Sequence, residues 1–302
     1  MPHVTFVLPA NAHLLDVAGA AQVFSTLADL GLPWTLDFVG AEPVASTRQG
    51  LGLAAGTTWP DRSTAADDLV VVPGWSVQRR PVPQEVAPHL LDRVRAHHEA
   101  GGTVMSVCAG AFALAACGLL DGRRATTHHA VQAELGRRHP LVHVVRDVLF
   151  VEDDRVLTSA GIASGIDLAL QVAARHHGPA VAARAARAMV VYARRNGPQA
   201  QESVMLRHRD HVDDLVHRVQ DVIDERFAER LPLADLADEV GVSARTLTRA
   251  FARSVGTTPL RYQQSVRLEH AELLIAAGRS VESAARSAGF EDARMLRRLR
   301  SR

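Results

Sequence analysis

The stretch "TVMSVCAGAFALAACG" (103–118) determines how the first half of the chain is interpreted. Its first five residues indicate a buried strand, and the alanine-rich run after Cys108 is typical of a helix. A cysteine in a tight, small-residue turn between a strand and a helix is the arrangement of a nucleophile elbow. The stretch therefore predicts a strand over 103–107, a turn at Cys108 and a helix that follows at once.

Strands alternate with helices through residues 1–178. The predicted strands are 3–8, 34–40, 67–74 and 103–107, and the predicted helices are 14–31, 86–102 and a pair within 165–195 broken at Gly178-Pro179. This alternation predicts an α/β fold with a parallel sheet covered by helices on both faces. Ligands bind such sheets beyond the carboxyl ends of the strands, where Pro73-Gly74 and Cys108 both lie. We expect them to face one crevice.

Composition is that of an ordinary globular protein, with 302 residues, 47% hydrophobic and 22% charged. No apolar run approaches the roughly 20 residues of a membrane span, and the N-terminus lacks the basic region of a signal peptide. Two cysteines, too far apart along a helix for a disulfide, fit a reducing compartment. We therefore expect a cytoplasmic protein without a membrane partner.

The basic residues are unevenly distributed, and all are arginine because the sequence contains no lysine. From Ser243 onward there are 12 Arg against 5 Asp and Glu, a net charge of +7. Such a patch suits a polyanion, since neutralised phosphates release counterions. A solvated, salt-bridged helix surface is the alternative that charge alone leaves open.

The sequence pattern changes after residue 195. The stretch "NGPQAQES" (196–203) has the Gly, Pro and polar content of a linker, and short helices with tight turns follow from about residue 208. The expected organisation is an α/β domain over 1–195, a linker over 196–210 and an all-α domain over 211–302.

The all-α domain begins with a helix-turn-helix pattern. Ala237 is small enough for two helices to cross closely, Gly241 permits the turn, and Ser243 is placed to cap the next helix. Leu247 and Phe251 are expected in the core. The side chains left towards solvent are those of Arg245, Thr248, Arg249 and Arg253.

The pattern recurs about 48 residues later. Ala285 stands four residues before Gly289, as Ala237 does before Gly241, and "LTR" (247–249) returns as "LRR" (296–298). A helix over 263–278 joins the two units. An internal repeat of this motif is much stronger evidence than a single occurrence.

This segment resembles the AraC/XylS family of DNA-binding domains. The resemblance is carried by "LADEVGVSARTLTRAFARSVGTTPLRY" (236–262) and by Arg267, Ala271, Leu274, Ala285, Gly289 and Phe290. It implies two recognition helices in successive major grooves, with base contacts from Arg245, Thr248 and Arg249. A helical oligomerisation module is the competing interpretation.

The second unit departs from the family pattern. Arg300 stands where the family has a phenylalanine, equivalent to Phe251, and the further helix that the family has after it is missing from a sequence that ends at Arg302. We therefore expect this unit to be less stable. Its DNA contacts, from Arg294, Arg297 and Arg298, are expected to go mainly to phosphates.

The first domain resembles the ThiJ/PfpI superfamily, which has the class I glutamine amidotransferase fold. The elbow carries the resemblance together with "VVPG" (71–74), "LLDVAG" (14–19) and "RATTHHA" (124–130). The stretch "TSAGIASGIDLALQVAARHHG" (158–178) is similar to the form of this domain that is fused to AraC-type ends. The whole chain is thus similar to the GlxA-like transcriptional regulators.

The resemblance implies a site around the thiol. Asp16 supplies an acid near Cys108, His128 an imidazole across the pocket, and Gly74 and Ala109 backbone N–H groups. A thiol has an ordinary pKa of about 8.5, which a helix N-terminus or a histidinium lowers. Asp16 would have to be protonated to donate a hydrogen bond to a thiolate.

Structural roles remain open for each of these residues. Cys108 could be a small packing residue, His128 could cap or pack beside His129, and Asp16 could be an acid favoured in the first turn of a helix. Cys117 is expected in the core. The histidines are scattered, so we expect no metal and no cofactor.

We expect a transcriptional regulator that senses a small metabolite in a pocket around Cys108. Its expected partners are operator DNA, the effector, a second copy of the chain and, as an open candidate, RNA polymerase. No second acid is placed for a Cys-His-Glu arrangement, which favours a sensor over an enzyme. The alternatives are a cysteine-dependent amidase, hydratase or glyoxalase-like enzyme with a DNA-binding tail, and a redox sensor at Cys108.

Overall fold

The chain divides into two compact units, Met1–Gln201 and Glu202–Arg302. The structure is a computed structural model, and it describes residues 2–32, 34–61, 64–65, 67–78, 81–191, 195–201, 203–276 and 278–300. None of the helices in these ranges has both the length and the apolar character that crossing a membrane requires.

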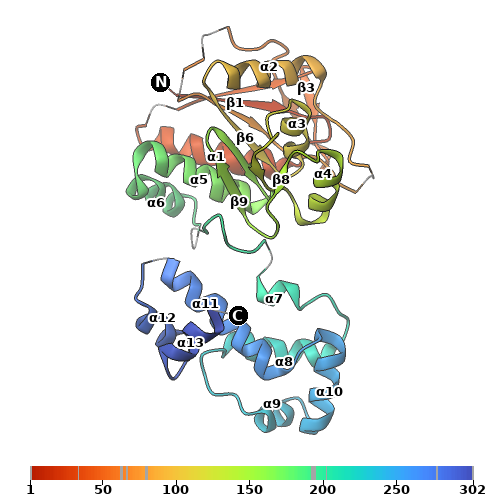
Figure 1. Ribbon diagram of the computed structural model, residues 1–302, viewed down its shortest axis with the longest axis vertical. Coiled ribbons are helices and arrows are strands. Elements are labelled where there is room, and N and C mark those ends of the chain that lie inside the picture. Colours follow the sequence, from red (N-terminus) through yellow and green to blue (C-terminus); the bar gives the residue numbers. More distant parts are fainter. Residues whose placement is uncertain are drawn as a thin grey trace. The chain divides into compact units, whose positions relative to one another are not determined.

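A six-stranded sheet forms the centre of the first unit, in the order β2-β1-β5-β6-β10-β9 (Figure 1). The strands are β1 (His3–Leu8), β2 (Thr35–Gly40), β5 (Leu69–Val72), β6 (Thr103–Val107), β9 (Phe150–Asp153) and β10 (Val156–Ser159). All neighbouring pairs are parallel except β10 and β9, which form an antiparallel hairpin at the edge. The expected parallel sheet is therefore confirmed, but the sequence indicated neither its parallel strand β10 nor its antiparallel edge strand β9.

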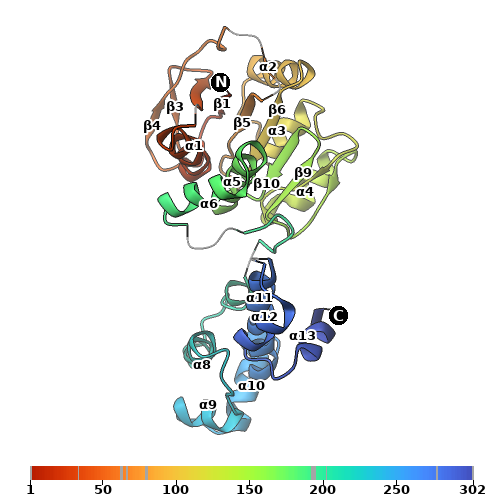
Figure 2. The same cartoon turned by 90° about the vertical axis from the view of Figure 1, so that its left-hand side faces the viewer.

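Helices cover both faces of this sheet (Figure 2). Helices α1 (Leu14–Asp29), α5 (Ala163–His177) and α6 (Pro179–Ala188) pack against one another on one face, and α2 (Pro88–Glu99) and α3 (Gly110–Ala116) pack on the other. Strand β5, "LVVV", is at most 2% exposed along its whole length. A strand covered on both faces has no solvent-exposed side that would favour polar residues. This explains its continuous apolar run.

Small elements complete the first unit around this core. They are β3 (Val44–Ser46) paired with β4 (Gly52–Ala54), β7 (Arg124–Ala125) paired with β8 (His143–Val144), the 3-10 turn His129–Val131 and α4 (Gln132–Arg138). The two-stranded pairs bring residues from the long connections close to the ends of the main strands.

Residues 195–201 pack onto the first unit. The Arg195 guanidinium lies 2.6 Å from the Asp167 carboxylate, and the Leu149 N–H donates to the Gly197 carbonyl at 2.9 Å. The Gln201 side-chain amide donates to two backbone carbonyls at 3.0 Å. The ordered packing of this unit thus continues into the stretch expected to be a linker. Glu202, which also falls in that stretch, lies outside the described residues.

The second unit is entirely helical among its described residues. Its helices are α7 (Val204–Arg207), α8 (Asp214–Glu225), α9 (Leu233–Glu239), α10 (Ala244–Val255), α11 (Pro259–Ala276), α12 (Val281–Ser287) and α13 (Ala293–Arg300). Side-chain oxygens of Asp213, Ser243 and Ser280 accept backbone N–H groups and cap α8, α10 and α12. Figure 1 shows α11 as the long helix that leads from the first helix-turn-helix to the second.

Limited proteolysis of the full-length chain should cut first between residues 196 and 210. The contacts of residues 195–201 go to the first unit, whereas the Val204 N–H donates to Glu269 of the second unit at 3.1 Å. The boundary between the two units falls between Gln201 and Glu202, and boundaries between compact units are usual sites of first cleavage. Mass spectrometry of the first fragments checks this expectation, and a first cut inside 60–130 would contradict it.

Candidate functional site

The backbone at Cys108 turns sharply between β6 and α3. Its φ is 55°, in the left-handed region that non-glycine residues rarely occupy. The Cys108 N–H donates to the Ser159 carbonyl at 3.0 Å, and its carbonyl accepts the Thr127 hydroxyl at 2.7 Å. Both neighbours hold the turn in place, so the thiol is presented at the carboxyl edge of the sheet.

Two glycines pack directly against Cys108. A Cβ at Gly74 would lie 2.6 Å from the cysteine Cβ and 2.5 Å from an Asp16 carboxylate oxygen. A Cβ at Gly161 would collide with the Cys108 side chain, and the φ of Gly161 is +101°. Only glycine fits at these positions, and their absent side chains allow Asp16 and Cys108 to approach each other.

Asp16 is fully buried beside the thiol. One carboxylate oxygen, Oδ1, accepts the Ile162 N–H at 2.6 Å. The other, Oδ2, faces Gly74 and Cys108 and makes no well-directed hydrogen bond with any described residue. Burial outweighs the neighbouring donors and raises the pKa of Asp16 to about 6.

The Cys108 thiol is also buried, with 2% of the residue exposed. Burial raises the pKa of the thiol well above its ordinary value, and the negative charge of Asp16 raises it further. The Ala109 N–H lowers it, as expected for an amide at the start of a helix, but by less. In this arrangement burial and the Asp16 carboxylate favour the protonated thiol over the thiolate.

The structure brings Asp16, Gly74, Cys108 and Ala109 together. His128 is half-buried and follows Thr127, whose hydroxyl bonds to Cys108. The His128 Nδ1 accepts the Ala130 N–H at 3.3 Å, and the ring lies 4.3 Å from that of His129. The capping role that the sequence left open for His128 is thus seen.

Sequence reasoning missed the group that closes the elbow from the opposite side. Gly161 and Ile162 follow β10, and the φ of Ile162 is 49°, which aims its N–H at Asp16. These residues lie in the quoted stretch 158–178, where "SAGIASG" is as rich in small residues as the elbow itself. That composition was the available signal.

The first helix-turn-helix is built as its sequence predicts. Gly241 makes the turn with a φ of +72°, and the Ser243 hydroxyl accepts the Thr246 N–H at 3.2 Å. Leu247 and Phe251 are fully buried, and the Phe251 ring meets that of Tyr262 edge-on at 5.7 Å. Helix α10 is therefore fixed to the core along one side.

The outer side of α10 carries cations that are available to a ligand. Arg245 and Arg249 are exposed and form no ion pair with any described residue. Thr248 is half-buried, and its hydroxyl donates to the Ala244 carbonyl at 2.9 Å. Arg253 is exposed, but its guanidinium lies 3.5 Å from the Asp213 carboxylate. The two unpaired guanidinium groups are one helical turn apart on the same face.

In the second helix-turn-helix, several arginines are paired with acids. Arg297 pairs with Glu282 at 2.6 Å, and Arg300 pairs with Glu272 at 2.7 Å instead of supplying a core aromatic. The guanidinium of Arg294 lies 3.8 Å from the Asp292 carboxylate, and Arg298 is exposed. Much of the positive charge of α13 is thus compensated within the unit.

No group of three or more potential ligands among the described residues could hold a metal ion. Polar contacts of the histidines instead go to neighbouring backbone and side chains, such as Trp34 Nε1 donating to His177 at 2.8 Å.

An α/β unit with a cysteine elbow, followed by a pair of helix-turn-helix motifs, defines the class of two-part AraC-type regulators. The chain belongs to the DJ-1/PfpI family, whose model matches residues 2–175, and residues 236–302 match a helix-turn-helix domain. The resemblances inferred from the sequence are confirmed by these matches.

Relatives of both kinds are similar to this chain. The HTH-type transcriptional regulator GbdR of Pseudomonas aeruginosa is 28% identical over 278 residues, covering 90% of this chain and 73% of GbdR. Isonitrile hydratase of Pseudomonas putida is 35% identical over 175 residues, covering 56% of this chain and 70% of the hydratase. A crystal structure of an AraC family transcriptional regulator from Pseudomonas putida has the same fold over 63% of this chain and 100% of its own, with a TM-score of 0.54 and 21% identity.

The Asp16→Asn variant should change how stability depends on pH. Because the pKa of Asp16 is about 6 in the folded chain and near 3.8 otherwise, the folded state binds the extra proton between these values. The cost of charging Asp16 is fully present above pH 7 and disappears below about pH 4, a difference of about 3 kcal/mol. Asparagine keeps an oxygen for Ile162 and never carries that charge.

Urea unfolding of the native chain and of Asp16→Asn at pH 4.5 and pH 7.5 measures this effect. The variant should gain free energy of unfolding relative to the native chain as pH rises. An equal difference at both pH values would show that Asp16 is charged throughout and that its burial is compensated elsewhere.

Proposed function

We propose that the chain is a DNA-binding transcriptional regulator whose first unit senses a small metabolite in a pocket around Cys108. The observation that carries the DNA-binding half is the pair Arg245 and Arg249, exposed and unpaired among the described residues on a helix anchored by Leu247 and Phe251. An unpaired guanidinium can donate two hydrogen bonds to guanine O6 and N7 in the major groove. The names of the relatives GbdR, CdhR and ArgR, all HTH-type transcriptional regulators, support the same function.

The two helix-turn-helix motifs make different kinds of contact with DNA in this proposal. In our proposal the first reads bases, because Arg245 and Arg249 pair with no acid among the described residues. The second adds mainly phosphate contacts, because Arg297 and Arg300 are already paired with acids. A second copy of the chain and RNA polymerase are the protein partners of this proposal, and the compartment is the cytoplasm, where a regulator meets the DNA.

The electrostatics at the elbow favour a sensor over a turnover enzyme. A catalytic cysteine needs a thiolate, and burial together with Asp16 raises the pKa of Cys108. In our proposal the polar groups at the elbow that recognise the metabolite include the buried Oδ2 of Asp16 and the Ala109 N–H. A thiol-dependent hydratase is the second candidate, favoured by the 35% identity to isonitrile hydratase.

The Cys108→Ala variant separates these two functions. A sensor should bind DNA within about twofold of the native affinity without the thiol, because Cys108 lies in the first unit. We also expect the native chain to turn over an isonitrile, an amide or methylglyoxal no faster than the variant does. Cys117→Ala, which changes the other buried cysteine, is the matched control. Turnover by the native chain and the control, but not by Cys108→Ala, would establish the enzyme.

Substitutions in the two recognition helices should have different effects on DNA binding. Arg249→Ala should relax the preference at one base position by about 1–3 kcal/mol. Arg298→Ala should weaken binding to all sequences alike and reduce the salt slope by about one. Gel-shift titrations on randomised duplexes at two salt concentrations measure both effects. If Arg298→Ala altered base preference as strongly as Arg249→Ala, the second motif would be a full reader of sequence.

A further inference from the structure

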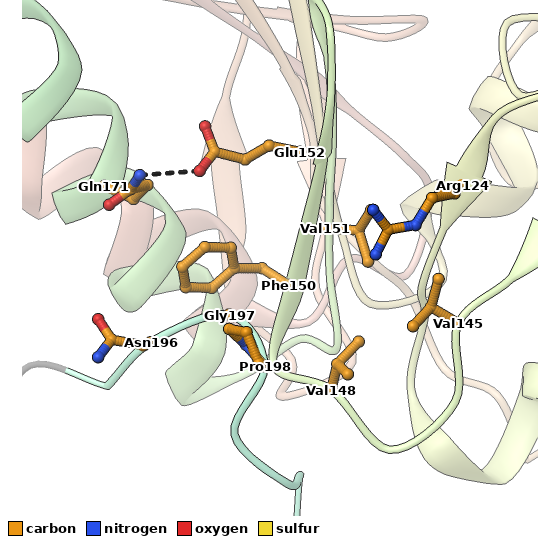
Figure 3. Close-up of a pocket in the computed structure, with 10 residues that line it drawn as sticks. All are labelled: Arg124, Val145, Val148, Phe150, Val151, Glu152, Gln171, Asn196, Gly197 and Pro198. Carbon is orange, nitrogen blue, oxygen red and sulfur yellow. Dashed lines mark hydrogen bonds between the residues drawn. The ribbon is translucent and has the colours of Figure 1, made fainter. Parts of the chain in front are cut away.

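A cavity of about 380 Å³ opens at the β9 edge of the sheet in the first unit. It shares no lining residue with the elbow, and its volume lies within the range of small-molecule sites. Figure 3 shows Arg124, Val145, Val148 and Val151 gathered on one side of β9, with Phe150 and Gln171 on the other. Gly197 and Pro198 pass below the strand and close the cavity from that direction.

The acids near this cavity are already compensated. The Asp153 carboxylate accepts the Arg123 guanidinium at 3.2 Å and the Arg124 backbone N–H at 2.9 Å. The two carboxylate oxygens of Glu152 accept Gln171 at 2.8 Å and Arg175 at 3.0 Å. The side chain of Arg124 is exposed and pairs with no acid of the described chain. The cavity therefore holds one uncompensated cation.

Apolar side chains lie beside that cation. Val145 and Val148 are half-buried, and Val151 is 5% exposed. We propose that the cavity binds a small organic carboxylate with a compact branched or aromatic body. Its carboxylate pairs with the Arg124 guanidinium in two charge-assisted hydrogen bonds, and its body covers Val145 and Val148. This site is separate from the pocket around Cys108 and does not depend on it.

Occupancy of the cavity acts on the segment that precedes the second unit. Gly197 approaches β9 so closely that a Cβ there would lie 2.8 Å from the Phe150 carbonyl oxygen. A ligand that touches Gly197 and Pro198 adds contacts that exist only while residues 195–201 are docked. Binding thus stabilises the docked state of residues 195–201. The size of this effect is set by how much more tightly the ligand binds when the segment is docked than when it is undocked.

Calorimetric titration of the full-length chain with 4-methylpentanoate and with benzoate tests the site. We expect both acids to bind, and their neutral amides to bind at least tenfold more weakly. Arg124→Gln should weaken the binding of the acids by about tenfold or more, since a charge-assisted pair is lost. Arg137→Gln, at an exposed and unpaired arginine of α4 outside the cavity, should leave it unchanged. Failure of both acids to bind at millimolar concentration, or equal binding by Arg124→Gln, would overturn the proposal.

Hydrogen exchange of the full-length chain with and without 4-methylpentanoate locates the ligand. Protection of peptides that cover 145–152 and 195–201 is the expected result. Protection confined to the elbow, 106–112, would overturn the cavity proposal while supporting a ligand pocket at Cys108. The DNA-binding proposal is tested separately by the duplex titrations.

Discussion

The left-handed backbone at Cys108 is the constraint on which the rest of the first unit depends. The chain must leave β6 and enter α3 within a residue or two, and a non-glycine residue with φ of 55° costs about 1–3 kcal/mol. Hydrogen bonds to Ser159 and from Thr127 offset that cost. The turn also draws three strand ends together, which is why glycines stand at 74 and 161 and why a carboxylate is buried at 16.

The same elbow that would expose a nucleophile here encloses a thiol beside an acid whose pKa is about 6. Burial and the proximity of the two groups disfavour the state in which both are charged.

The structural features that were predicted correctly are mostly those that depend on short-range sequence patterns. The β6–Cys108–α3 turn, the Ser243 cap and the buried Phe251 all follow from spacing within a few residues. The approach of Gly74 to the thiol followed from the rule that parallel strands share a carboxyl edge. The approach of Asp16 was instead implied by the resemblance to the ThiJ/PfpI superfamily. Strands β9 and β10 were missed because each has only four residues, too few to give a clear strand pattern.

Long-range side-chain contacts were beyond the reach of such patterns. The ion pair between Arg297 and Glu282 spans 15 positions, and it decides whether the arginine is available to DNA. The docking of residues 195–201 depends on Asp167 and Leu149, which nothing in the composition of "NGPQAQES" indicates. Likewise, nothing in the local sequence indicates that Asp153 pairs with Arg123 and Glu152 with Arg175, whereas Arg124 pairs with no acid of the described residues.

The small core of the second helix-turn-helix has a consequence for how the chain behaves in solution. Its buried residues are four alanines, Phe290 and Leu296, so little apolar surface is removed from water when this half forms. A region with so few buried contacts opens at a low free energy, independently of the larger core around Phe251 and Tyr262. Its amide protons should exchange with solvent early, and DNA that orders it must supply the lost conformational entropy. The heat capacity and entropy of association then report local folding as well as contact with the duplex.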